Sequence, residues 1–366
     1  DYFFGTDKNA WSTGAYPSIL PNKDITWERS EQLDLGLDAR FLSSRLGVTF
    51  DWYKKTTKDW LVQAPILGSQ GAAAPYINGG DVTNKGVELS LTWNDMVGDF
   101  SYGVNANLAV NKNKITRIAN SEGVIEGTNP GFGDGQPPIY RAQVGYPIGY
   151  FYGLKTAGVF QNQEQIDNYE GAMLSGTAPG DLIFVDMNKD GVIDMADRTM
   201  IGDPNPNMNL GLTVNLGYKG FDFSVTANGV FGNQIASSFH KVNHYKENYP
   251  SVLLGRWHGE GTSNRYPRLT ADSSPNFMQF NDIYIDNGDF LRIQNVTLGY
   301  DFKKLFPKMI LQQARLYVTV QNLYTFTGYY GSDPEIGTAP EGWSKGVDSG
   351  FYPIPRTVLV GANIKF

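Results

Sequence analysis

The feature that most constrains this chain is a period-two alternation of apolar and polar residues, which recurs in nine segments. In one of them, Val87, Leu89, Leu91 and Trp93 are separated by Glu88, Ser90, Thr92 and Asn94. Successive side chains of a β-strand point to opposite faces, so each segment predicts a strand with one apolar and one polar face. The segments are residues 33–41, 46–52, 87–94, 100–111, 210–218, 221–227, 291–300, 316–320 and 358–366.

The lengths of these segments and of their links indicate a membrane barrel. Several segments approach the roughly 9 to 11 residues of a tilted membrane-spanning strand, and aromatic residues such as Trp52 and Tyr300 mark their ends. Short links alternate with four long ones, residues 62–83, 112–206, 233–288 and 327–354. Short turns on one rim and long loops on the other are typical of outer-membrane barrels. The sequence therefore predicts an all-β, antiparallel transmembrane β-barrel with long extracellular loops.

The polar faces and the strand count indicate that this barrel is larger than the chain. The polar faces carry charges that are costly to bury without water: Asp34, Asp38, Arg40, Glu88, Asp222, Arg315 and Lys365. They predict a wide lumen that holds water or a polar plug. Bacterial single-chain barrels have even strand numbers, and open sheet edges are unstable in lipid. Nine strands therefore predict that other strands complete the barrel.

Two segments give finer predictions. The alternation changes phase between Ile293 and Val296, which predicts a β-bulge. In the last segment, the apolar residues are expected to face lipid, whereas Asn363 and Lys365 face the lumen. The lipid-facing residues are Val358, Val360, Ala362, Ile364 and Phe366.

Composition and the first residues narrow the classes of protein to which the chain can belong. The net charge of -7 disfavours nucleic acid as a partner. The chain has no cysteine and 3 histidines, which leaves little for thiolate or imidazole chemistry and disfavours an enzyme. Residues 1–5 show no signal-peptide pattern, and we interpret the chain as a piece of a longer polypeptide.

Residues 186–197 match the spacing of an EF-hand-like calcium loop. Oxygen donors occupy loop positions 1, 3, 5, 9 and 12, and they are Asp186, Asn188, Asp190, Asp194 and Asp197. Gly191 permits the tight turn, and Val192 would offer its backbone carbonyl. The last position is Asp instead of the usual Glu, so its carboxylate has a shorter reach. The spacing predicts a structural calcium site, and a solvated acidic turn is the alternative.

The long loops are rich in aromatic residues, on which sugar rings or peptides can pack. We select Tyr245, Trp257, Trp343 and Tyr352 as candidates for substrate contact, although most loop aromatics are expected to pin loops together. His240 and His244 have the i, i+4 spacing of zinc proteases, but Lys241 stands where those enzymes have Glu. We expect both histidines to be exposed loop residues.

Several motifs in order resemble the SusC/RagA-type TonB-dependent outer-membrane transporters. These motifs are Asn22–Glu28 followed by Gln32–Asp38, Gly149–Gln161, Asp186–Pro206, Tyr218–Phe223, and Val296–Tyr300 with Tyr317–Leu323. The resemblance extends over nearly the whole chain. It implies that residues 1–366 form the last nine strands of a barrel of about 22 strands, with residues 112–206 as a long extracellular loop. The plug, the TonB-contacting segment and the remaining strands would lie upstream.

The resemblance also implies a function. The whole protein would be no enzyme but a transporter in the bacterial outer membrane, importing oligosaccharides or peptides with energy from TonB. A SusD-like surface lipoprotein would rest on the long loops as a lid. Two alternatives stay open at this point. One is a secreted all-β carbohydrate-binding or hydrolytic protein, and the other is a passive porin.

Overall fold

The structure is a computed structural model of the whole chain. It describes residues 2–3, 11–12, 18–64, 71–127, 129, 131–132, 137–238, 249–270, 276, 279–336 and 345–366. The paired histidines of the sequence, His240 and His244, lie outside these residues. No helix in the described part is long and apolar enough to cross a membrane.

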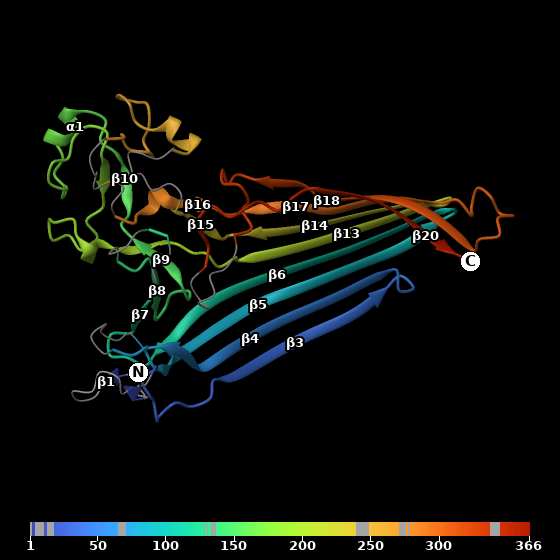
Figure 1. Cartoon of the computed structure of the whole chain (residues 1–366), viewed down its shortest axis with the longest axis horizontal. Coiled ribbons are helices and arrows are strands. Elements are labelled where there is room, and N and C mark those ends of the chain that lie inside the picture. The colour runs from blue at the N-terminus through green and yellow to red at the C-terminus, as the bar shows by residue number, and fades with distance from the viewer. Residues whose placement is uncertain are drawn as a thin grey trace.

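A nine-stranded antiparallel sheet forms the main body of the molecule (Figure 1). Its strands, in sequence order, are β3 (Arg29–Phe41), β4 (Leu46–Gln63), β5 (Tyr76–Val97), β6 (Phe100–Ile118), β13 (Met208–Tyr218), β14 (Phe221–Phe231), β17 (Phe290–Asp301), β18 (Gln313–Thr327) and β20 (Thr357–Lys365). Each strand pairs with the next one in this order, and β3 and β20 are the edges. Every alternating segment of the sequence lies in one of these strands, apart from Phe366 at the end of the last.

The strand register gives the sheet one apolar and one polar face. Cross-strand partners form a continuous apolar row through all nine strands: Phe41, Leu46, Trp93, Val104, Val214, Val225, Val296, Val320 and Val358. The adjacent row, on the opposite face, is Arg40, Gly47, Thr92, Asn105, Thr213, Thr226, Asn295, Gln321 and Thr357. Paired residues share a face, so the alternation within each strand gives the whole nine-stranded sheet one apolar and one polar face. We call this sheet the wall.

The predicted bulge is present in β17. The register with β14 shifts between Ile293 and Asn295, so Gln294 is the extra residue of β17 in that pair. The register with β18 shifts at the same place, where two residues of β18, Asn322 and Leu323, lie opposite Gln294. The shift allows Ile293 to stay in an apolar row with Ala227 and Tyr324 while Arg292 lies on the polar face. The phase change in the sequence is thus confirmed as a structural feature.

Short and long connections separate to opposite ends of the sheet (Figure 1). The turns after β3, β5 and β13 are short, and Gly98, Lys219 and Gly220 adopt positive φ angles there. The long connections gather at the other end and fold into an assembly of small sheets, which we call the loop assembly. This sorting is the one expected of a barrel with a turn rim and a loop rim.

The loop assembly contains three small sheets and short helices. Its elements are β7 (Val124–Glu126), β8 (Tyr140–Gln143), β9 (Tyr150–Gly153) and β12 (Thr199–Gly202) in one sheet, β10 (Thr156–Val159) with β11 (Leu182–Phe184), β15 (Gln234–Ser237) with β16 (Ile285–Asn287) and β19 (Val347–Asp348), α1 (Gln163–Asp167), and the 3₁₀ turns Met195–Asp197, Ser251–Gly255 and Asp282–Tyr284. A separate pair joins β1 (Tyr2–Phe3) to β2 (Trp11–Ser12).

The main hydrophobic core lies inside the loop assembly and not inside the wall. It is built around the buried rings of Tyr140, Phe151, Phe184, Phe280 and Tyr284. A smaller core joins the assembly to the outer ends of β4 to β6, and its members are Val62, Val82, Ile115, Ile118, Ile125 and Ala142. The long connections therefore form a packed platform anchored on the wall.

Candidate functional site

The polarity of each face of the wall indicates what that face contacts. On the apolar face, large side chains remain exposed in this chain, among them Leu298, Leu316 and Val360 at 52%, 51% and 79%. An exposed apolar band across nine strands is unstable in water and suits the hydrocarbon of a bilayer. The polar face then lines the lumen. On this face, the two carboxylate oxygens of Asp222 accept from the guanidinium of Arg315 at 2.8 and 2.5 Å.

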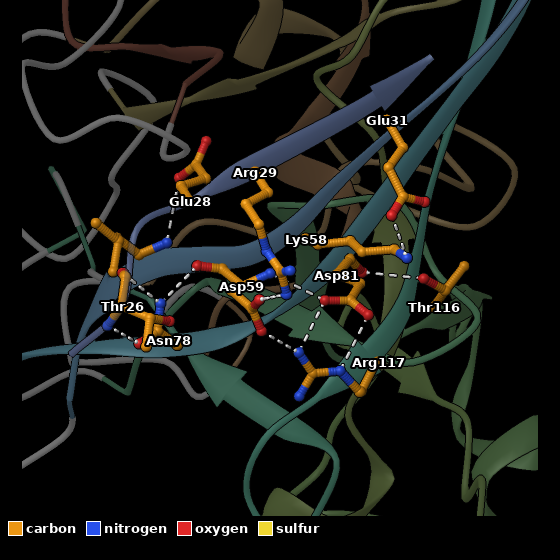
Figure 2. A network of polar contacts seen from close by, with 11 residues as sticks. Thr26, Glu28, Arg29, Glu31, Lys58, Asp59, Asn78, Asp81, Thr116 and Arg117 are labelled. Carbon is orange, nitrogen blue, oxygen red and sulfur yellow. Dashed lines mark hydrogen bonds and ion pairs between the residues drawn. The ribbon is translucent and has the colours of Figure 1, made fainter. Parts of the chain in front are cut away.

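An ion-pair network ties the loop-rim ends of β3 to β6 together (Figure 2). Asp59 accepts from Arg29 at 2.7 Å and from Arg117 at 2.9 Å. Arg117 also forks onto Asp81 at 2.8 and 3.0 Å, and the backbone N–H of Asp59 donates to Asp81. Asp59 sits at the bulge of β4 with a positive φ of 57°. The network therefore holds an irregular stretch where the strands leave the membrane.

Five segments of the loop assembly meet in a buried polar cluster. Ser237 of β15 donates to Asp286 of β16 at 3.2 Å, and Tyr329 donates to Asp348 of β19 at 2.6 Å. Ser237 and Tyr329 lie 3.2 Å apart, and Arg265 pairs with Asp286 at 2.7 Å. Burial raises the pKa of the Asp286 carboxyl, and Arg265 opposes that shift. Burial and then Asp348 raise the pKa of Tyr329, so its hydroxyl stays a donor.

The predicted calcium loop is compact and closed by its own hydrogen bonds. The carboxylate of Asp186 accepts from the backbone N–H groups of Lys189 and Gly191 at 2.5 and 2.8 Å. Asp197 is fully buried and accepts from Met187 and Asp194. Among the described residues, no three His, Asp or Glu side chains are grouped as a metal site. The turn is compact, and calcium binding at these residues stays a prediction.

The aromatic candidates have different surroundings. Trp257 is partly buried against the core of the loop assembly and packs over Gly180, where an added Cβ would lie 2.4 Å from its ring. Tyr352 is 90% exposed after β19 and free to contact a ligand. Tyr245 and Trp343 lie outside the described residues. The structure therefore leaves Tyr352 accessible and shows a packing contact for Trp257.

A comparison with known protein families agrees with a sheet that has one apolar and one polar face. The profile of the family described as "TonB dependent receptor-like, beta-barrel" covers residues 1–188, half of the chain. The chain belongs to this family. Proteins of the TonB-dependent receptor family lie in the bacterial outer membrane, which agrees with the apolar outer face.

Individual relatives support the assignment. A TonB-dependent receptor, P3, of Formosa agariphila is 34% identical over 96% of this chain and 36% of its own length. TonB-dependent receptor SusC of Bacteroides thetaiotaomicron is 29% identical over 94% of this chain and 32% of its own length. The chain thus spans about a third of the curated relatives it matches.

Solved structures agree on the fold. The structure described as the RagAB peptide transporter has a TM-score of 0.74 at 24% identity and covers 94% of this chain and 36% of that one. The RagAB peptide importer in its closed-closed state has a TM-score of 0.73 at 25% identity. These matches confirm that the nine-stranded wall is part of a larger TonB-dependent receptor barrel.

Sequence reasoning missed the ion-pair network and the buried polar cluster. Both join residues far apart in the chain, such as Arg117 and Asp59, which are separated by 58 positions. The only local signal was the charge of residues in or beside strands. Charge shows that a partner is needed, but not which residue supplies it.

Proposed function

We propose that the whole protein imports oligosaccharides or peptides across the outer membrane and catalyses no reaction. The observation that carries this proposal is the wall with an unbroken apolar row on one face and an unbroken polar row on the other. A wall of this kind, as part of a larger barrel, encloses a wide polar lumen suited to hydrophilic cargo. The similarity to TonB-dependent receptors supports an energised import in place of free diffusion.

We propose further that a SusD-like lipoprotein covers the loop assembly and that TonB acts through a part of the protein outside this chain. The support is similarity to TonB-dependent receptor SusC and to the RagAB peptide importer. The loop assembly offers a suitable base because its own core, including Phe151 and Tyr284, makes it a packed body.

Uptake measurements in the native bacterium test this proposal. We expect deletion of the full gene to stop uptake of a labelled oligosaccharide or peptide that is too large for ordinary porins, and complementation to restore it. Deletion of TonB should have the same effect. A receptor that still admits the cargo without TonB would be a passive pore, and this result would contradict energised import.

We also propose that residues 186–197 bind calcium in the full protein. The compact turn and its spacing of oxygen donors support this site, in which Asp186, Asn188, Asp190, Asp194, Asp197 and the Val192 carbonyl would be the ligands. A filled coordination shell leaves no open position for a reacting water, so the ion would be structural. It would neutralise the clustered carboxylates and stiffen the loop.

A further inference from the structure

Three lysines form a continuous row on the apolar face of the wall, at its loop-rim end. Lys54 of β4 pairs with Lys85 of β5, and Lys85 pairs with Lys112 of β6. Residues two positions apart in a strand share a face, and the row two residues closer to the turn rim is apolar. Its members in these strands are Trp52, Val87 and Val110. The register is unbroken between the two rows, so the lysines border the lipid-facing band.

A fourth lysine extends this row toward the loop assembly. Lys114 lies opposite Thr83, in the next row of the same face. All four lysines are exposed in this chain. We call these residues the basic strip: Lys54, Lys85, Lys112 and Lys114.

The basic strip carries positive charge that the described part of the chain does not neutralise. None of its lysines forms a salt bridge with a described residue. Glu31, on the same face of β3, is already paired with Lys58 at 2.6 Å (Figure 2). Asp59 and Asp81 accept from arginines of the network in that figure. An anion that neutralises the strip therefore has to come from outside the described residues.

The cross-strand pairing brings the lysines close to one another. Directly opposite residues of an antiparallel pair have Cβ atoms about 5 Å apart, and like charges at such positions destabilise a sheet. The row contains two such pairs, Lys54–Lys85 and Lys85–Lys112. An anion over the row would bridge the ammonium groups and replace this repulsion with attraction.

We propose that the basic strip binds the phosphate groups of a lipid in the outer leaflet, and that the acyl chains of this lipid cover the apolar row beside it. The long connections are extracellular, so the loop rim lies at the outer leaflet. Lysine stems lie along apolar surface and carry their charge to the head groups, and each lysine at a membrane surface adds attraction to anionic lipid. The inference rests on the outer-membrane location and not on the import of a cargo.

The surroundings of the strip favour a lipid over a soluble anion or an acidic protein. Trp52 lies two residues from Lys54 on the same face, and tryptophan is typical of the border between lipid and water. A ligand that covers both rows needs an anionic part and an apolar part. Inorganic phosphate would satisfy the lysines alone, and an acidic protein would have to displace lipid from the apolar row.

Native mass spectrometry of the full-length protein in neutral detergent tests the proposal. The probes are lipid A, which carries phosphate groups, the same lipid with its phosphates removed, and inorganic phosphate. We expect lipid A to bind about a hundredfold more tightly than the dephosphorylated lipid, since each lysine of the row should contribute about fivefold. Equal affinities would overturn the proposal. Inorganic phosphate that binds as tightly as lipid A would also overturn it, because the apolar row would then contribute nothing.

A matched pair of single variants locates the binding. Lys54→Gln should weaken the binding of lipid A about fivefold. Lys55→Gln should leave it unchanged, because Lys55 is the adjacent residue on the opposite, lumen face, where it pairs with Asn84. Lys54→Arg keeps the charge and should retain the binding. The same loss in both Gln variants would show a general effect of charge and overturn the assignment to the strip.

The triple variant Lys54→Gln/Lys85→Gln/Lys112→Gln gives a second readout. It should lose the preference for lipid A, and lipid A should raise the unfolding temperature of the wild type but not that of the variant. In detergent without lipid, the variant should unfold at the wild-type temperature or above it, because the repulsion between the lysines is removed. A variant that still prefers lipid A would overturn the proposal. So would a variant that unfolds at a lower temperature without lipid, since the lysines would then have partners within the protein.

Discussion

The guanidinium of Arg292, on the polar face of β17, lies 2.5 Å from the carboxylate of Asp333 in the segment after β18. Both side chains are buried, at 3% and 9% exposure. Arg292 also donates to Glu335 at 2.6 Å and to Thr325 at 2.9 Å, so all of its nitrogens have partners. The pair fixes the segment around residue 333 against the lumen wall, which places part of a long connection inside the barrel mouth.

Removing one partner of this pair should be costly. Arg292→Met leaves Asp333 charged and buried, and we expect the local stability of the segment to fall by about 3–5 kcal/mol. The amide of Ile354, which donates to Asp333, should then exchange its hydrogen faster. Adding Asp333→Leu should recover part of the lost stability because no buried charge is then left unpaired, Glu335 being half exposed. Equal exchange rates in the wild type and Arg292→Met would contradict the role of the pair.

The network of Figure 2 should stabilise the loop rim selectively. Arg117→Gln removes the fork onto Asp81 and the contact with Asp59. Hydrogen exchange at the loop-rim ends of β4 and β5 is expected to rise several-fold, while the turn rim stays protected. Arg45→Gln, which breaks the Arg45–Asp95 pair at the other rim, is the matched control and should give the opposite distribution. If each variant raised hydrogen exchange equally at both rims, the network would have no local role.

Calcium should bind to the loop at residues 186–197 with weak affinity. Titration calorimetry on the full-length protein is expected to give a dissociation constant of about 10⁻⁴ to 10⁻³ M, the range of extracellular modules. Asp190→Ala should weaken binding at least about tenfold because it removes a central ligand. Asp99→Ala at the turn rim serves as the control. Identical titrations for Asp190→Ala and the wild type would leave the solvated turn as the correct interpretation.

Gly180 should be required for the packing of Trp257. Gly180 has a φ of 91°, and an added Cβ would lie 2.4 Å from the indole, so Gly180→Ala should cost about 1–3 kcal/mol through overpacking. Exchange of the Arg268 amide, which donates to the Gly180 carbonyl, reports the loss. Gly176→Ala separates backbone strain from the contact with the indole, since Gly176 has a similar φ of 79° but open space around it. If both variants behave alike, backbone strain and not the indole contact explains the cost.

The wall was predictable from the sequence because each strand carries its own signal. Alternation fixed the apolar side of every segment, and the phase change at Ile293 located the bulge. Strand lengths were underestimated. Strand β4 ends at Gln63 and β5 begins at Tyr76, and both ends lie beyond the alternating segments. Beyond the membrane, lipid no longer imposes an apolar side, so the pattern fades while backbone pairing continues.

The loop assembly was less predictable. Its core joins Tyr140, Phe184 and Tyr284, which come from different connections, and no local period marks them. The same holds for Arg292 and Asp333, whose charges were visible while their pairing was not. The turn at Asp186–Asp197 is the exception, since its shape depends on local side-chain contacts with the backbone, which spacing alone can indicate.

The most direct test of the two-faced wall uses Leu298 and Thr297, adjacent residues of β17 on opposite faces. The chain has no cysteine, so Leu298→Cys and Thr297→Cys can each carry a single spin label, in a full-length protein freed of other cysteines and reconstituted in lipid. Collision with oxygen, which partitions into lipid, and with a water-soluble nickel complex is then measured. The account predicts a label at 298 that meets oxygen and is shielded from nickel, and a label at 297 with the reverse preference. Equal access of nickel to both labels would contradict a wall with one face in lipid and one in the lumen.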